Sequence, residues 1–246
     1  NTIDRRSTGG GKILDNYISP YEATVITKIR EQGAVLIGKN NCDAFGHGAS
    51  NEQSMYGPVR NPHDEKHVSG GSSGGSAVSV ADHQCIFSIG EDTGGSIRQP
   101  ASFCGVVGMK PTYGRVSRYG LVAFASSLDQ IGPFTKTVAD TALMLNMMCG
   151  KDSKDSTSVD KKVPDFTKSL NQDIKGLKIG VIKELMGKGA DPEVKKAIED
   201  SIQKFTALGA ICEEVSLPSF DYAVATYYII APAEASANLS RFDGVK

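Results

Sequence analysis

The stretch SGGSSGGSAVSVADHQCIFSIGEDTGGSIRQP, residues 69–100, carries the two features around which we expect the rest of the chain to be arranged. Two clusters of glycine with serine or threonine, Gly70–Ser76 and Thr93–Ser96, flank a short helix-like run and the apolar run Cys85–Ile89. Glycine lets backbone N–H groups turn inward and approach a ligand closely. We therefore expect the functional site of the chain to be built on these two turns.

Ser96 follows the apolar run and its glycine-rich turn. In open α/β sheets, ligands lie at the carboxyl ends of the strands. Gly94 and Gly95 allow the N–H groups of residues 93–96 to converge on one point. That is the geometry of an oxyanion hole, in which one donor is worth roughly 3–4 kcal/mol. We expect Ser96 to be the nucleophile of an acyl transfer and Ser72 to pass protons to and from it. The alternative is a plain glycine-rich turn with a helix-capping serine.

Ser72 lies in the first turn, ahead of the helix-like run Ala77–Ala81. This placement also fits a helix N-cap or a phosphate cradle, although no Gly-Lys-Ser/Thr follows, as a P-loop requires. Residues 71–75 match G-x-S-x-G, but a nucleophile elbow needs a preceding strand and a later histidine, and all four histidines precede Ser96. Lysine replaces histidine in other serine sites. The candidates by proximity in sequence are Lys12, Lys39, Lys66 and Lys110.

The composition is that of an ordinary globular protein. The chain has 246 residues, a net charge of −1 and 39% hydrophobic residues, and this balance gives no sign of a basic nucleic-acid surface. No apolar run reaches the roughly 20 residues that span a bilayer. The five cysteines are scattered without a C-x-x-C pair, which disfavours zinc and redox motifs and suits a reducing cytosol. Both ends look cut, so we expect a fragment of a longer chain.

Helical patterns alternate with apolar runs typical of buried strands, and this alternation predicts an α/β fold. We expect helices over residues 19–33, 77–81, 137–150 and 191–209. We expect strands over residues 34–38, 85–89, 106–109, 121–124, 178–182 and 211–215. The last two strands and the helix between them form a βαβ unit. The apolar side chains expected to face inward from its helix are Val194, Ile198, Ile202, Phe205 and Leu208.

Several motifs resemble the amidase signature family. They are Gly70–Ser76, Asp92–Pro100, Lys110–Gly120, Ser126–Gly132 and Ala237–Val245. The later motifs resemble the glutamine-hydrolysing A subunits of the tRNA-dependent amidotransferases. The resemblance implies one amidase-signature domain over residues 1–246, with a mixed central sheet covered by helices on both faces and incomplete at both ends.

The resemblance also implies a Ser–cis-Ser–Lys triad. Ser96 would be the acyl-enzyme nucleophile, and Ser72, preceded by a cis peptide bond, would be the proton bridge. The lysine would lie just upstream of Asn1, so we expect the chain as given to be inactive by itself. The implied oxyanion N–H donors belong to Thr93, Gly94, Gly95 and Ser96.

Three further points follow from the resemblance. Either Tyr227 or Tyr228 falls where the family's A subunits have a tyrosine near the glutamine. Glu91 occupies a position at which we would more often expect a smaller or a basic residue. The family's later contacts with the carboxylate and amine of the substrate would lie beyond Lys246.

The implied reaction is glutamine hydrolysis that supplies ammonia for converting Glu-tRNA(Gln) or Asp-tRNA(Asn) to Gln-tRNA(Gln) or Asn-tRNA(Asn), a ligase activity. The implied partners are a B subunit, which holds ATP, Mg²⁺ and the misacylated tRNA, and a small C subunit. No cofactor, metal or membrane is expected for this chain, and the expected location is the cytoplasm or an organelle matrix. The alternatives are a stand-alone amidase of the same family and an inactive phosphate-binding or scaffold homologue.

Overall fold

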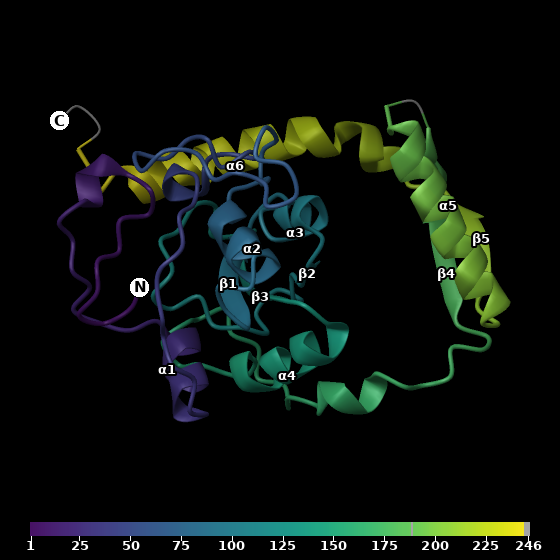
Figure 1. Cartoon of the computed structure of the whole chain (residues 1–246), viewed down its shortest axis with the longest axis horizontal. Helices are drawn as coiled ribbons and strands as arrows, with labels where there is room; N and C mark the ends of the chain where they lie inside the picture. The colour runs from purple at the N-terminus through teal and green to yellow at the C-terminus, as the bar shows by residue number, and fades with distance from the viewer. Residues whose placement is uncertain (188, 244–246) are drawn as a thin grey trace. The chain divides into compact units, whose positions relative to one another are not determined.

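The chain forms two compact units. The computed structural model describes residues 1–187 and 189–243, so Gly244 and Val245 of the last motif lie outside the described residues. One unit contains residues 1–170 and the segment from residue 230 onward, and the other contains residues 171–229. Helices and strands occur in both units (Figure 1), which confirms the α/β class. The single domain over residues 1–246 stays a prediction.

The first unit is built on a three-stranded antiparallel sheet in the order β1-β3-β2. β1 (Phe87–Asp92) pairs along its length with β3 (Gln130–Thr135), and β2 (Val107–Gly108) pairs with the other edge of β3. The register places Asp92 opposite Gln130. The segment that follows β1 and the segment that precedes β3 therefore meet at the same end of the sheet.

Helices cover both faces of this sheet, as expected (Figure 1). The helices are α1 (Thr24–Glu31), α2 (Gly74–Ala81), α3 (Arg98–Cys104) and α4 (Val138–Met148). α2 and α3 share a buried cluster with Phe134, whereas α1 and α4 share a second cluster with Ile131. Successive side chains of a strand point to opposite faces, so Ile131 and Phe134 of β3 serve the two different layers.

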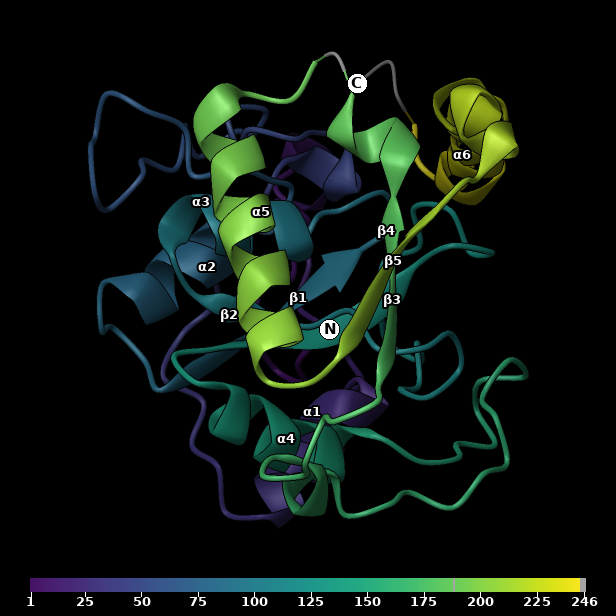
Figure 2. The ribbon, with the colours of Figure 1, turned by 90° about the vertical axis from the view of Figure 1, so that its right-hand side faces the viewer.

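The second unit contains the predicted βαβ arrangement. β4 (Lys178–Ile182) pairs in parallel with β5 (Ile211–Val215), and α5 (Pro192–Ala207) connects them and packs beside β5 (Figure 2). The parallel pair and the antiparallel strands thus belong to two separate sheets. α5 begins where the sequence predicts, because the Asp191 carboxylate accepts the N–H of Glu193 at 2.8 Å.

The apolar side chains predicted to face inward from the helix are not fully covered in the described structure. No residue of α5 is buried, and Val194 and Leu208 are 54% and 64% exposed. A two-stranded sheet offers too little surface to cover a 16-residue helix.

Two predicted strands are absent from the described residues. Residues 34–38 have no strand partner, and the side chains of Val35 and Ile37 are 82% and 71% exposed. Residues 121–124 form an irregular loop instead of a strand. The centre of the sheet is β3, which the sequence analysis did not predict.

The first helix begins at Thr24, five residues later than expected. The Ser19 N–H donates to the carbonyl of Arg5 at 3.1 Å, and Arg6 forms a β-bridge with Ile18. These bonds hold residues 18 and 19 in an extended conformation. The Ser19 hydroxyl donates to the carbonyl of Tyr21 at 2.6 Å instead of capping the helix.

The remaining elements are one long helix and several single turns. α6 (Ala223–Leu239) contains Pro232 and runs from the second unit into the first. The 3₁₀ turns are η1 (Lys12–Leu14), η2 (Ala44–Gly46), η3 (Phe166–Ser169), η4 (Lys183–Met186) and η5 (Pro218–Tyr222).

We predict that Thr137→Ala destabilises the full-length protein by about 1 kcal/mol, because Thr137 is the N-cap of α4. Its hydroxyl oxygen accepts the Asp140 N–H at 3.1 Å and donates to the Asp140 carboxylate at 2.7 Å. Urea denaturation measures the change. Thr137→Ser keeps the hydroxyl and should retain most of the stability. An equal loss in both variants would show that the cap is not the cause.

Candidate active site

Ser73 joins the two glycine-serine turns into one site. Its N–H donates to the carbonyl of Ser96 at 3.2 Å, and its hydroxyl donates to the Glu91 carbonyl at 3.0 Å while accepting the Glu91 N–H at 3.1 Å. A second bond joins the turns where the Gly71 N–H donates to Gln99 Oε1 at 3.1 Å. The structure therefore brings together the two stretches that the sequence singles out.

Ser72 lies in a tightly packed part of the first turn and is 3% exposed. The peptide bond between Gly71 and Ser72 is cis, as the resemblance implies. A Cβ at Gly71 would lie 2.3 Å from Asp43 Oδ2, so only glycine fits there. The carbonyl of Ser72 accepts the Asp43 N–H at 3.1 Å, and the Asp43 carboxylate accepts the N–H groups of Asn51 and Gln53, each at 2.8 Å. Sequence reasoning missed Asp43, since nothing in its neighbourhood marks it.

The fully buried carboxylate of Asp92 shapes the second turn. Its Oδ1 accepts the Gly95 N–H at 2.9 Å, and its Oδ2 accepts the Ile97 N–H at 3.1 Å. The guanidinium of Arg98 donates to both oxygens, at 2.9 and 3.0 Å. Burial raises the pKa of Asp92, but the hydrogen bonds and charge of Arg98 outweigh it and hold the pKa below its ordinary value. Asp92 binds the residues on both sides of Ser96 and thereby fixes the backbone at Ser96.

The predicted oxyanion donors are not equivalent. The N–H of Gly95 is already donated to Asp92, whereas no described residue accepts the N–H of Gly94 or of Ser96. Gly95 has a φ of +129°, a conformation that side chains rarely adopt. Gly94 is exposed and Ser96 is half-buried.

Within the described residues, no lysine or histidine hydrogen-bonds to Ser72 or Ser96. Lys39 Nζ donates to Ser7 Oγ at 3.2 Å, and Lys110 Nζ donates to the carbonyl of Pro111 at 2.9 Å. His47 Nδ1 lies 2.9 Å from the carbonyl of Phe45, and its ring packs 4.2 Å from the ring of Phe124. Among the described residues, these three side chains bond to other groups than the two serines.

Tyr227 and Tyr228 belong to the second unit. Their rings meet edge to face with centroids 5.5 Å apart, and Tyr228 is 67% exposed. A role for either tyrosine near the substrate stays a prediction.

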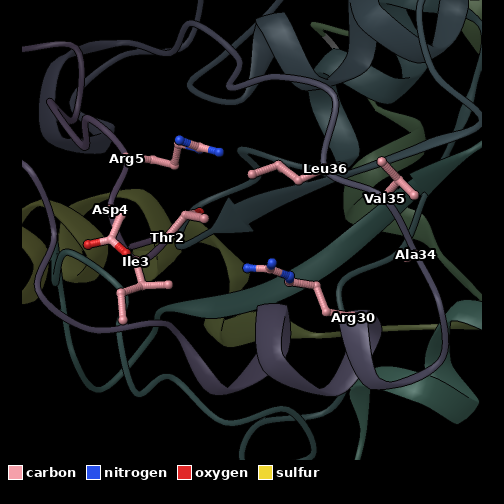
Figure 3. Close-up of a pocket in the computed structure, with 8 residues that line it drawn as sticks. All are labelled: Thr2, Ile3, Asp4, Arg5, Arg30, Ala34, Val35 and Leu36. Atoms are coloured by element: carbon pink, nitrogen blue, oxygen red, sulfur yellow. The ribbon is translucent and has the colours of Figure 1, made fainter.

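A separate hollow of about 440 Å³ in the first unit contains none of the predicted catalytic residues (Figure 3). Its lining combines the two guanidinium groups of Arg5 and Arg30 with the apolar segment that was expected to be a strand. Arg30 forms an ion pair with Glu22, in which Nη1 lies 3.0 Å from Oε1. The hollow therefore has no part in the serine site.

The described residues contain no group of three or more His, Cys, Asp or Glu side chains placed to hold a metal ion. In the same part of the chain, no helix is long and apolar enough to cross a membrane.

Glu91 is an unusual neighbour of the two turns. Its backbone is bonded to Ser73, while its Oε1 is buried and has no partner among the described residues. Burial, followed by the charges of Asp129 and Asp92, raises the pKa of Glu91 well above its ordinary value.

Comparison with known proteins gives the class of this site. The family model described as Amidase matches residues 1–246, so the chain belongs to the amidase family. It is 61% identical over 245 residues to the A subunit of glutamyl-tRNA(Gln) amidotransferase from Carboxydothermus hydrogenoformans, and 61% identical over 241 residues to the protein of that name from Syntrophus aciditrophicus. These matches cover 100% and 98% of this chain and 50% of each relative, so the chain spans about half the length of the relatives it matches.

Solved structures agree with this assignment. The crystal structure of the glutamyl-tRNA(Gln) amidotransferase A subunit from Thermotoga maritima is similar with a TM-score of 0.94 and 50% identity, over 99% of this chain and 54% of that one. The native peptide amidase from Stenotrophomonas maltophilia is similar with a TM-score of 0.83 and 32% identity, over 95% of this chain and 49% of that one.

We predict that Glu91→Gln raises the melting temperature of the full-length protein near neutral pH. When the pH rises above the ordinary glutamate pKa of 4.5, the unfolded chain loses the Glu91 proton while the folded protein still holds it. The free energy of unfolding therefore falls as the pH rises. The glutamine side chain does not ionise in this pH range, so it removes this loss. Thermal unfolding across a pH series should show the gain at about pH 7.5 and little gain at about pH 4.

Glu199→Gln, on the exposed face of α5, is the matched control and should leave the pH dependence unchanged. A Glu91→Gln profile parallel to that of the wild type would contradict the prediction.

Proposed function

We propose that the full-length protein hydrolyses glutamine as the A subunit of a tRNA-dependent amidotransferase. The observation that carries the proposal is the joined pair of turns, in which Ser73 ties the Ser72 loop to the Ser96 turn. The names of the relatives at 61% identity support the assignment to an amidotransferase A subunit.

The proposed reaction begins when Ser96 Oγ attacks the side-chain amide carbon of glutamine. The Ser96 proton passes to Ser72 and from there to a base. The carbonyl oxygen becomes an oxyanion that accepts the N–H groups of the turn, and such preorganised donors are among the largest contributions to catalysis. Collapse of this intermediate breaks the C–N bond, and the amide nitrogen leaves as ammonia with the proton returned through Ser72. Water then hydrolyses the glutamyl ester on Ser96 to release glutamate.

The proposed base is a lysine that the full-length protein supplies upstream of Asn1. This proposal is supported by two observations: no described lysine or histidine hydrogen-bonds to Ser72 or Ser96, and the relatives are about twice as long as the chain. A buried lysine has a lowered pKa and can accept a proton. We accordingly propose that residues 1–246 alone release no ammonia from glutamine.

The proposed partners are a B subunit, which uses ATP and Mg²⁺ to activate misacylated tRNA and receives the ammonia, and a C subunit that joins the other two. The assembly would be a heterotrimer in the cytoplasm or an organelle matrix. The net charge of −1 gives no sign of a basic surface for tRNA on this chain, which supports the assignment of tRNA binding to the B subunit.

We predict that Ser96→Ala in the full-length protein with its partner subunits lowers glutamine-dependent ammonia release by at least about a thousandfold, because the acyl-enzyme can no longer form. Ser72→Ala should also abolish most of the activity, since it removes the proton bridge. Ser201→Ala changes an exposed serine on α5 and should behave as the wild type. Wild-type rates in the Ser96 variant would refute the proposed nucleophile.

The similarity to a peptide amidase makes a stand-alone amidase the second candidate. A subunit of an amidotransferase copurifies with its B and C partners, and ATP with misacylated tRNA stimulates its glutaminase activity. A stand-alone amidase shows neither effect and hydrolyses small amides without partners.

A further inference from the structure

The carboxylate of Asp129 links the loop before β3 to the catalytic turn after β1. Asp129 is 1% exposed. Its Oδ1 accepts the hydroxyl of Thr93 at 2.6 Å and the N–H of Ala125 at 3.0 Å, and its Oδ2 accepts the N–H of Phe124 at 2.9 Å. Thr93 and Asp129 are 36 positions apart in the sequence, and they meet because the neighbouring residues Asp92 and Gln130 are paired in the sheet.

Asp92 and Asp129 hold different parts of the same turn. The bonds of Asp92 reach Gly95, Ile97 and Arg98, on the carboxyl side of the turn and beyond it. Among the described residues, the Asp92 carboxylate makes no hydrogen bond to Thr93 or Gly94. The Thr93 hydroxyl bond to Asp129 is thus the side-chain anchor for the part of the turn that carries the free Gly94 N–H.

The loop that carries Asp129 is itself held by α6. Asn238 Nδ2 donates to the carbonyl of Phe124 and to Ser126 Oγ, both at 3.1 Å. The Glu234 carboxylate accepts the N–H of Ser127 at 2.9 Å and its hydroxyl at 2.6 Å. These four bonds fix the loop that carries Asp129. The Asp129 carboxylate can therefore hold the Thr93 hydroxyl in one position.

We propose that Asp129 is a positioning residue for hydrolysis at Ser96, acting through the Thr93 hydroxyl to aim the N–H groups of the turn at the oxyanion. This inference rests on the proposed function. Donors of this kind act on charge that develops in the transition state, so their misplacement lowers kcat more than it raises KM. Asp129 touches neither substrate nor nucleophile in this arrangement and is not a catalytic residue.

The test compares four variants of the full-length protein in its complex: Thr93→Val, Thr93→Ser, Asp129→Asn and Asp152→Asn. Thr93→Val removes the hydroxyl at nearly constant volume and should lower kcat for glutamine roughly tenfold to a hundredfold, with KM changed by less than about threefold. Asp129→Asn should act in the same direction. Thr93→Ser keeps the hydroxyl and should retain most of the wild-type kcat.

Asp152→Asn is the matched control. The Asp152 carboxylate likewise accepts two hydroxyl groups, from Thr24 at 2.5 Å and Ser117 at 2.6 Å, and both lie outside the catalytic turn. The change should lower the melting temperature and leave kcat unchanged. A wild-type kcat in Thr93→Val and Asp129→Asn, or a loss of kcat in Asp152→Asn as large as theirs, would overturn the inference.

Amide hydrogen exchange in the peptide that covers the turn gives a readout independent of activity. We expect faster exchange in Thr93→Val and Asp129→Asn than in Thr93→Ser and Asp152→Asn, because an unanchored turn opens more often. Equal exchange in all four variants would overturn the inference. A wild-type complex that releases no ammonia would instead refute the proposed function, and the exchange measurement would still decide the role of Asp129.

Discussion

The buried carboxylate of Asp92 fixes the conformation of the turn that carries Ser96. It accepts hydrogen bonds from backbone N–H groups on both sides of Ser96 and from the guanidinium of Arg98. A buried charge is tolerated only when it is paired and hydrogen-bonded, and this carboxylate has both kinds of partner. Without it, the glycine-rich turn would have more accessible conformations, and the bond from the Ser73 N–H to the Ser96 carbonyl would have to hold the serine beside the first loop.

The antiparallel sheet extends this local order across the first unit. Because the end of β1 and the start of β3 are paired, their flanking loops meet, and two buried carboxylates, Asp92 and Asp129, hold the two parts of one turn. Ser73 then ties that turn to the loop of Ser72. The bonds made by Asp92, Asp129 and Ser73 thus bring two serines from separate turns into one site.

The sequence revealed the elements that depend on local patterns, and it failed where distant contacts decide. The two turns, the helix α4 and the βαβ unit follow from neighbouring residues. The sequence analysis did not predict β3 because Gly132 and Pro133 lie in its middle, and a proline argues against a central strand. Residues 34–38 have the apolar pattern of a strand but no strand partner among the described residues. α6 was not predicted, and it contains Pro232, which argues against a continuous helix. The roles of Asp43 and Asp129 include bonds to the distant residues Ser72 and Thr93, so residue type alone does not mark them.

The central claim is that Ser96 carries the acyl group, and rapid quenching of the full-length complex with glutamine tests it most directly. Peptide mass mapping of the quenched protein should find a glutamyl ester on Ser96 and leave Ser72 unmodified, in an amount that rises with the first turnover. Acylation of a different residue, or release of ammonia in the first turnover without any ester at Ser96, would contradict the account.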